Sequence, residues 1–428
     1  MNPAMMNPNN PPRNFRMNRF AGTAALMLLL VTGVPARTWT SADGAKTFEG
    51  ELKSYDPATG AVGVTQPSGT VMKFNQDKLS AADIAFLKAQ GKIDAPSANK
   101  PAADKIDTDP KNLFKKPDGK PADMSKPAQV FILMGQSNMV GMGKIAGGEG
   151  SLENAVKTKN KYPYLVDEAG GWLERKDVRF VRYMSGQGPL NNEWMGIKGG
   201  TIGPEYGIGQ VVGNAIDAPV MILKCCIGNR SLGWDLLPPG SERFEEGGKV
   251  YAGYKDSPDS WAKGTEPKPI GWYAGKQYDD DTADAKTALA DLDKHYPGAK
   301  KYEVAGFFLW QGEKDGLNAV HASRYEKNLV AFIKALRKDF NAPTAKFVLA
   351  TMGEAVKGSG NKVMEGQFAV DGATGKHPEF KGNVATVYSN PLSLGGSGNG
   401  HYNGNAETYM NVGEAMGKAM AELLKNQK

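Results

Sequence analysis

Residues 130–141 read Val130-Phe-Ile-Leu-Met-Gly-Gln-Ser-Asn-Met-Val-Gly141. An unbroken apolar run ends at Gly135, and Ser137 follows two positions later. Such a run is typical of a strand that is buried on both faces of a parallel sheet. Chemistry in open α/β sheets gathers just beyond the carboxyl ends of these strands, so Ser137 stands where a nucleophile is expected. The alternative is that Ser137 only caps a helix that follows.

Two distant segments favour the catalytic interpretation. The apolar run 304–309 ends in Trp310-Gln311-Gly312-Glu313, and Gly398-Asn-Gly-His401-Tyr-Asn-Gly-Asn405 precedes an amphipathic helix near the C-terminus. Together with Gly135-Gln-Ser-Asn138, this ordered set resembles the SGNH hydrolases, and more narrowly their sialate O-acetylesterase-like branch, grouped with carbohydrate esterase family six. The resemblance covers roughly residues 127 to 425. It implies a three-layer α/β/α sandwich around a parallel, flavodoxin-like sheet.

The hydrophobic pattern indicates an α/β fold without that resemblance. Buried strands alternate with amphipathic helices, which is the pattern of a parallel sheet between helical layers. Strands are expected at 128–134, 219–225, 303–309, 346–351 and 383–388, and helices at 205–216, 281–294, 322–339 and 405–425.

The chain divides into four segments. Residues 1–36 have the basic start, apolar run and small residue before the cleavage point that are typical of a secretory signal peptide, so export and a mature start near Arg37 are expected. A membrane anchor is the alternative, but the apolar run is shorter than the ~20 residues needed to span a bilayer. We expect no stable membrane insertion after signal cleavage.

A small β module is predicted over residues 37–90, followed by a Pro-, Lys- and Ala-rich linker over 91–126 and the hydrolase domain over 127–428. The module resembles the SH3-like homology-1 module in Arg37-Thr-Trp-Thr-Ser, Asp43-Gly44, Phe48 and the stretch from Leu79 to Asp83. It carries no evident catalytic group, and we expect it to bind an unidentified ligand or protein, or to act as a spacer.

Composition excludes some partners and cofactors. The net charge of +6 is spread along the 428 residues, and no basic block is interleaved with aromatic residues, so no nucleic acid partner is expected. The four histidines are scattered and the two cysteines are adjacent, without the spacing of a metal site. The expected reaction needs no metal and no organic cofactor.

Acyl transfer requires a nucleophile, a base and an orienting group for that base. Ser137 is the expected nucleophile and His401 the expected base, because the resemblance places the catalytic histidine just before the last helix. The family commonly has an aspartate three residues before this histidine, whereas this chain has Gly398. Three orienting groups remain open: Glu313, which is slightly favoured, Asp315, or a backbone carbonyl.

Acyl transfer also requires donors for the developing oxyanion. One expected donor is the N–H group of Ser137, at the start of a helix. A second is expected from the turn that follows strand 219–225, where Gly228 matches the first glycine of the family's second block and Asn229 replaces the second. The third is the side-chain amide of Gln311, which stands where many SGNH enzymes have asparagine.

The substrate residues are the least specific part of the prediction. An insertion at 230–280 is rich in Trp and Tyr, whose rings are suited either to stacking on sugars or to packing the insertion's own small core, and the sequence leaves both open. The residues expected to bind substrate are Gln136, Asn138, Arg230, Trp234, Trp272 and Trp310.

These features predict an exported carbohydrate O-acetylesterase that acts on an O-acetylated carbohydrate through a Ser–His acyl-enzyme mechanism. One alternative is a non-catalytic glycan-binding protein on a decayed esterase scaffold, which the missing aspartate makes credible. The other is a lipase-like or aryl esterase, which predicts an apolar pocket that the polar insertion does not favour.

Overall fold

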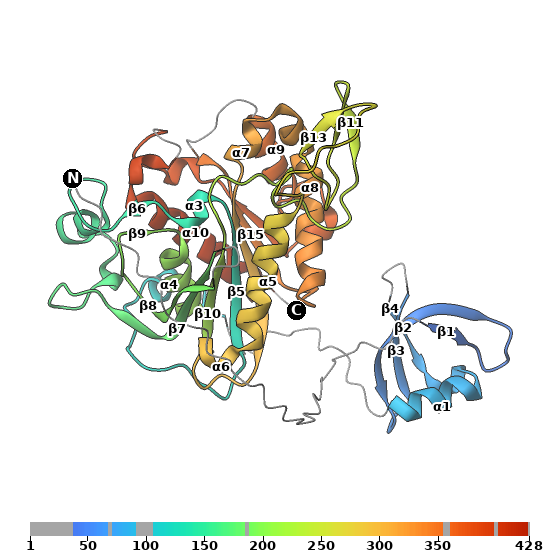
Figure 1. Cartoon of the computed structure of the whole chain (residues 1–428). Coiled ribbons are helices and arrows are strands. Elements are labelled where there is room, and N and C mark those ends of the chain that lie inside the picture. Colours follow the sequence, from blue (N-terminus) through green and yellow to red (C-terminus); the bar gives the residue numbers. More distant parts are fainter. Residues whose placement is uncertain are drawn as a thin grey trace, which may run out of the picture. The chain divides into compact units, whose positions relative to one another are not determined.

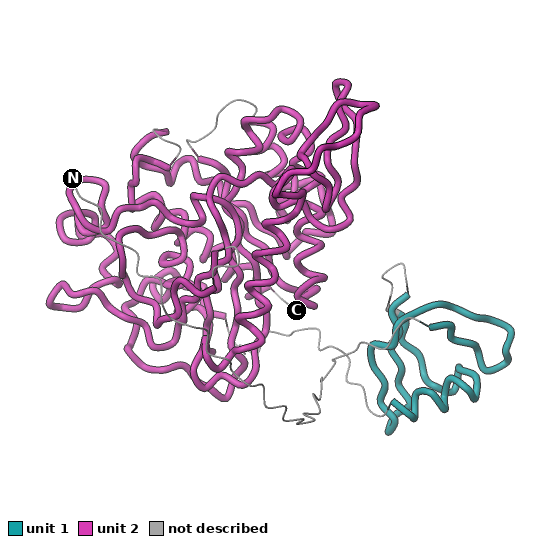
Figure 2. Tube along the Cα trace, in the orientation of Figure 1, with its two compact units in different colours: residues 1–96 teal, residues 97–428 magenta. Residues whose placement is uncertain are grey.

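The computed structural model describes residues 37–66, 71–90, 106–184, 188–353, 360–397 and 401–426. The chain forms two compact units, residues 1–96 and residues 97–428 (Figure 2). The signal-peptide prediction falls on residues outside the described part. Within the described residues, no helix combines the length and apolar character needed to span a membrane.

The first unit is a four-stranded antiparallel sheet with one helix. Strands β1 (Arg37–Thr40), β2 (Thr47–Asp56), β3 (Ala61–Thr65) and β4 (Val71–Asn75) pair in chain order, and α1 (Ala81–Gln90) follows. Trp39 and Tyr55 are fully buried in its core. The buried carboxylate of Asp83, at the start of α1, accepts hydrogen bonds from Ser80 and from the backbone of Thr40, and pairs with Arg37 at 2.6 Å. These contacts tie the helix to β1.

The second unit is built around a seven-stranded sheet in the order β16-β15-β14-β5-β10-β7-β8 (Figure 1). All neighbouring strands are parallel except β7 and β8, which pair antiparallel at one edge. The sheet consists of β5 (Ala128–Gly135), β7 (Glu174–Tyr183), β8 (Pro189–Gly196), β10 (Val220–Cys225), β14 (Tyr302–Trp310), β15 (Lys346–Ala350) and β16 (Val384–Val387).

Helices cover both faces of this sheet. Phe131 and Leu133 of β5 pack in one core with residues of α4 (Glu205–Ala215) and α10 (Ala406–Lys425). Val130 and Ile132 point to the other face and pack with α5 (Lys276–Ala290) and α8 (Ala319–Asp339). Since neighbouring residues of a strand point to opposite faces, the unbroken apolar run in β5 fills two cores at once.

Shorter elements complete the unit. The helices are α2 (Pro110–Leu113), α3 (Ser137–Val140), α6 (Leu292–His295), α7 (Glu313–Gly316) and α9 (Gly360–Ala369), and the short strands are β6 (Gly143–Lys144), β9 (Thr201–Ile202), β11 (Phe244–Glu246), β12 (Lys249–Tyr251) and β13 (Ser260–Ala262). The last three strands form an antiparallel sheet of their own within the insertion.

The five predicted strands and four predicted helices all lie in regular elements of the expected kind. The expectation of a wholly parallel sheet is wrong at one edge, because β8 returns antiparallel to β7. The predicted linker over 91–126 also extends too far. From Ile106 onward the described chain packs on the second unit: Ile106 bridges to Ile216, Leu113 is 2% exposed, and Asn214 donates to the carbonyl of Lys115.

Candidate active site

The proposed nucleophile lies on a tight turn at the carboxyl end of β5. Gly135 ends the strand with φ +147°, and a Cβ atom added there would lie 2.4 Å from the carbonyl oxygen of Trp310. This close approach of β14 excludes any side chain at position 135. Ser137 then opens α3, with its side chain at the edge of the sheet where the parallel strands end.

His401 lies beside this serine. Its Nε2 atom is 2.8 Å from Oγ of Ser137, which is hydrogen-bond distance. Partial burial lowers the pKa of His401 below its ordinary value of 6.5. The imidazole is therefore predominantly neutral at pH 7, which is the form that accepts a proton.

The loop that carries His401 is anchored by the next residue. The ring of Tyr402 stacks on Trp310 with 5.9 Å between ring centroids, and its hydroxyl donates to the carbonyl of Met352 at 2.7 Å. Trp310 is fully buried and its Nε1 donates to the carbonyl of Thr351. The prediction that Trp310 binds substrate is thus wrong, because the ring supports the histidine loop from within the core.

The turn after β10 brings Gly228 against the nucleophile. A Cβ atom added at Gly228 would lie 3.5 Å from Cβ of Ser137. Neither residue's N–H group donates a hydrogen bond to another described residue. Asn229 has φ +58°, a left-handed conformation that asparagine tolerates better than most non-glycine residues. This explains why asparagine can replace the family's second glycine.

Gln311 does not present its amide to the nucleophile. The side chain is 1% exposed, and its Nε2 donates to the carbonyl of Arg230 at 2.9 Å and to Oδ2 of Asp315 at 2.6 Å. Its Oε1 accepts from the hydroxyl of Tyr325. The predicted oxyanion role of the Gln311 side chain is wrong, because both of its N–H donors already satisfy buried acceptors.

The acidic residues expected to orient His401 have other partners. The two carboxylate oxygens of Glu313 accept hydrogen bonds from Gln136 and Asn138, the residues on either side of Ser137. Burial raises the pKa of Glu313 to about 7. Asp315 accepts from the backbone N–H groups of Leu232 and Gly233. Both carboxylates therefore hold the active-site turns together, and the orienting role expected of Glu313 or Asp315 stays a prediction without a described contact to His401.

Two of the predicted substrate residues share this buried network. Asn138 is fully buried and accepts a hydrogen bond from the hydroxyl of Tyr409, while Gln136 is 3% exposed. Their side-chain amides are committed to Glu313. The two buried amides position the residue between them in this arrangement, and substrate contact by Gln136 and Asn138 stays a prediction.

The sequence left open whether the aromatic residues of the insertion stack on sugars or pack its own small core, and the structure places Trp234 and Trp272 differently. Trp234 packs with Leu237, Ala252 and Ala274 in a small core of the insertion, so its expected substrate role is not supported. Trp272 lies under the guanidinium group of Arg230, with 4.3 Å from Cζ to the ring centroid. Arg230 stands two residues after Gly228, the residue whose Cβ position lies 3.5 Å from Cβ of Ser137, and both Arg230 and Trp272 are half-buried.

Sequence reasoning missed a supporting pair on α5. Nε2 of Gln277 donates to the carbonyl of Gly135 at 3.0 Å and to Oδ2 of Asp281 at 2.9 Å. Both side chains are fully buried, and burial raises the pKa of Asp281 well above its ordinary value. The predicted helix over 281–294 does not include Gln277, whereas α5 begins at Lys276 and so places this pair, four residues apart, on one helix face.

Among the residues with described coordinates, no group of three or more His, Cys, Asp or Glu side chains could hold a metal ion. Residues 127–422 match the family model described as "Carbohydrate esterase, sialic acid-specific acetylesterase". The chain belongs to this carbohydrate esterase family. The match spans the whole sheet and the turns that carry Ser137, Gly228, Gln311 and His401.

Several solved structures are similar to parts of the esterase at low sequence identity. A protein from Arabidopsis thaliana shares 18% identity and a TM-score of 0.43 over 69% of this chain and 98% of its own. A carbohydrate acetylesterase from Xanthomonas citri shares 12% identity and a TM-score of 0.37 over 90% of this chain and 68% of its own. NanS shares 15% identity and a TM-score of 0.31 over 56% of this chain and 74% of its own. A comparison with curated proteins gives no match.

Proposed function

We propose that this carbohydrate esterase is an exported O-acetylesterase that removes acetyl groups from a glycan, with Ser137 as nucleophile and His401 as general base. The observation that carries the proposal is the 2.8 Å contact between Nε2 of His401 and Oγ of Ser137. A neutral imidazole at that distance can take the hydroxyl proton as the oxygen attacks.

The reaction proceeds in two steps. Oγ of Ser137 attacks the acetyl carbonyl carbon while His401 takes the hydroxyl proton, and His401 then gives this proton to the departing sugar oxygen. Next, His401 takes a proton from a water molecule that attacks the acyl-enzyme, and it returns this proton to Oγ as acetate leaves. Acetate and the deacetylated sugar are the products.

The N–H groups of Ser137 and Gly228 are the proposed oxyanion donors, with that of Asn229 as a further candidate. The N–H groups of Ser137 and Gly228 have no acceptor among the described residues, and this and the closeness of Gly228 to Ser137 support the assignment. Preorganised backbone donors of this kind contribute on the order of 10²–10³-fold each to turnover.

Glu313 and Asp315 are engaged elsewhere, so a backbone carbonyl is the remaining candidate among the three orienting groups that the sequence left open for His401. Gly398 and Gly400 lie outside the described residues. Turnover should then be lower than with an acidic partner, since an aspartate in this role can contribute on the order of 10⁴-fold in serine proteases.

Substrate contact is proposed for Arg230 and Trp272. The side chain of Arg230 is 26% exposed and lies over the Trp272 ring. An aromatic face suits the C–H face of a sugar ring, and a guanidinium group suits its hydroxyl or carboxylate oxygens.

Export and the role of the first unit are also proposals. The basic and apolar composition of residues 1–36 supports a cleaved signal peptide. The antiparallel sheet and single helix of residues 37–90 support an SH3-like module that binds an unidentified ligand or protein.

Acetate release from a panel of O-acetylated glycans tests the proposal. Ser137→Ala and His401→Ala should each lose nearly all turnover and keep the melting temperature. His377→Ala is the matched control, because His377 pairs with Glu326 rather than with Ser137 and its loss should leave turnover unchanged. If Ser137→Ala retained more than a tenth of wild-type turnover, the assignment of Ser137 as the nucleophile would be wrong. Absence of covalent labelling by a serine-directed phosphonate would favour the non-catalytic glycan-binding alternative.

A further inference from the structure

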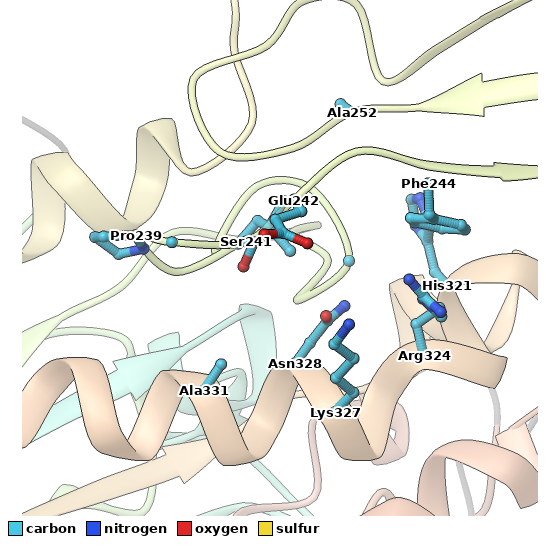
Figure 3. Close-up of a pocket in the computed structure, with 13 residues that line it drawn as sticks. Pro239, Ser241, Glu242, Phe244, Ala252, His321, Arg324, Lys327, Asn328 and Ala331 are labelled. Atoms are coloured by element: carbon cyan, nitrogen blue, oxygen red, sulfur yellow. The ribbon is translucent and has the colours of Figure 1, made fainter. Parts of the chain in front are cut away.

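A cavity of about 290 Å³ lies between α8 and the insertion, apart from the Ser137–His401 pair. One face of α8 forms one wall of the cavity, the α8 wall, with His321, Arg324, Lys327, Asn328 and Ala331. Figure 3 shows the α8 side chains pointing toward the segment that carries Ser241 and Glu242. The volume is near the lower end for ligand sites, about 300 Å³, which fits a single small ligand unit.

The α8 wall presents hydrogen-bond donors that bind no acceptor among the described residues, and of these Lys327 is exposed while Asn328 and Arg324 are half-buried. The Lys327 ammonium and the Asn328 amide have no hydrogen-bond or ion-pair partner among the described residues. The Arg324 guanidinium lies over the Phe244 ring at 3.9 Å and has no carboxylate partner within the described part of the chain. Two cations, Lys327 and Arg324, and the Asn328 amide line one small space, so its complement is an anion with several acceptor oxygens.

The opposite wall suits the neutral part of such a ligand. Ser241 and Glu242 face α8 across the cavity (Figure 3) and offer a hydroxyl and a carboxylate that can bind hydroxyl groups. A ligand with one carboxylate and several hydroxyls would satisfy both walls. An acidic sugar has this composition.

The cavity is linked to the active site by one short segment. Gly228 lies against Ser137 and Gly233 lines the cavity, and the five Cα-to-Cα steps from one glycine to the other can span at most about 18 Å. The N–H group of Gly233 donates a hydrogen bond to Asp315, which fixes this residue. A Cβ atom added at Gly233 would lie 2.6 Å from Cγ of His321. One glycan chain could therefore reach both places.

We infer that this cavity is an accessory subsite for an acidic sugar residue of the glycan, held through its carboxylate by Lys327, Asn328 and Arg324. The inference rests on the proposed function for the identity of the ligand as part of a glycan. It adds a second point of attachment, at residues other than Ser137 and His401.

Direct binding tests the subsite without any need for turnover. Glucuronate, with glucose as the neutral comparison, would be titrated into the full chain and followed by calorimetry or NMR. Lys327→Glu should weaken glucuronate binding by at least about tenfold, whereas Lys327→Arg should retain it. Lys338→Glu is the matched control, because it makes the same charge change on an exposed part of α8 outside the cavity.

Kinetics provides the second readout. Lys327→Glu should raise KM for an acidic O-acetylated oligosaccharide by about tenfold and leave kcat/KM for nitrophenyl acetate unchanged. Equal glucuronate affinities in Lys327→Glu and Lys338→Glu, or no glucuronate binding by the wild type, would overturn the subsite. A chain that binds glucuronate at this cavity but releases no acetate would contradict the proposed function and leave the subsite standing.

Discussion

Nε2 of His401 lies 2.8 Å from Oγ of Ser137, although 264 residues separate them in the chain. Two turns at the same edge of the sheet bring them together: the one that follows β5 and the one that precedes α10. Each turn is tied to β14, because Gln136 donates its N–H group to Trp310 and Tyr402 stacks on the same residue. The strand between the two halves of the site therefore sets their separation.

This contact predicts the pH dependence of the reaction. His401 must be neutral to accept the serine proton, and burial lowers its pKa below 6.5. We expect kcat/KM for a small acetyl ester to rise with pH, with a midpoint below 6.5, and to be level above pH 7. Stopped-flow measurements between pH 4.5 and 8.5 would check this. A midpoint above 7 would show that the folded protein stabilises the charged imidazole.

A single added methyl group at Gly228 should block the acyl position. Its Cβ atom would lie 3.5 Å from Cβ of Ser137, an ordinary contact that the fold accepts. Gly228→Ala should therefore keep its melting temperature and lose kcat/KM on the order of 10²-fold, because the acetyl group must approach Ser137 through this space. Gly271→Ala is the control, since a Cβ atom there meets nothing within 4 Å. Equal turnover in the two variants would place the acyl group elsewhere.

Gln311 is expected to act on stability more than on chemistry. Gln311→Leu leaves the carbonyl of Arg230 and the carboxylate of Asp315 each short of a buried donor, whereas the hydroxyl of Tyr325 still donates to the backbone carbonyl of residue 311. The free energy of unfolding should fall by about 2–3 kcal/mol, whereas Tyr325→Phe, which removes one donor, should lower it by about 1 kcal/mol. Urea titration would measure both values. If Gln311→Leu kept its stability and lost all turnover, the side-chain amide of Gln311 would instead be assigned as an oxyanion donor.

The sequence predicted what depends on repeating patterns and on fixed positions along the chain. Apolar runs and helical spacing located the strands and helices, and the end of β5 located Ser137. The partners of buried polar side chains follow no such pattern. Glu313 was expected to reach His401 from a neighbouring loop, but its carboxylate accepts from the amides of Gln136 and Asn138 instead. That choice depends on side-chain direction within a packed core, which spacing alone does not encode.

The insertion shows the same limit. Its aromatic residues were equally compatible with sugar stacking and with a local core. The structure assigns Trp234 to the local core and places Trp272 under Arg230. The pairing of Gln277 with the carbonyl of Gly135 left no recognisable signal, because it joins α5 to the nucleophile turn across 142 residues.

Glu313→Gln tests how the nucleophile is positioned. Each carboxylate oxygen of Glu313 accepts from an amide beside Ser137, so a glutamine must turn its own NH₂ group toward Gln136 or Asn138. Two buried donors facing each other cost about 1–3 kcal/mol, and the turn should relieve this by shifting Ser137. We expect kcat to fall strongly with little change in KM.

The variant should also change how stability depends on pH. Burial raises the pKa of Glu313 from 4.5 to about 7, so the folded state holds its proton more tightly than the unfolded chain does. The corresponding stability is present below pH 4.5 and is lost as pH rises through 7, and Glu313→Gln should lack this decline. Urea unfolding at pH 5 and pH 8 would measure it. Glu303→Gln is the control, because Glu303 lies near the other end of β14 and accepts from Gln129.

Since Glu313 has no contact with the imidazole in this arrangement, the pH midpoint assigned to His401 should be the same in both variants. A shifted midpoint in Glu313→Gln alone would restore Glu313 as the partner of His401.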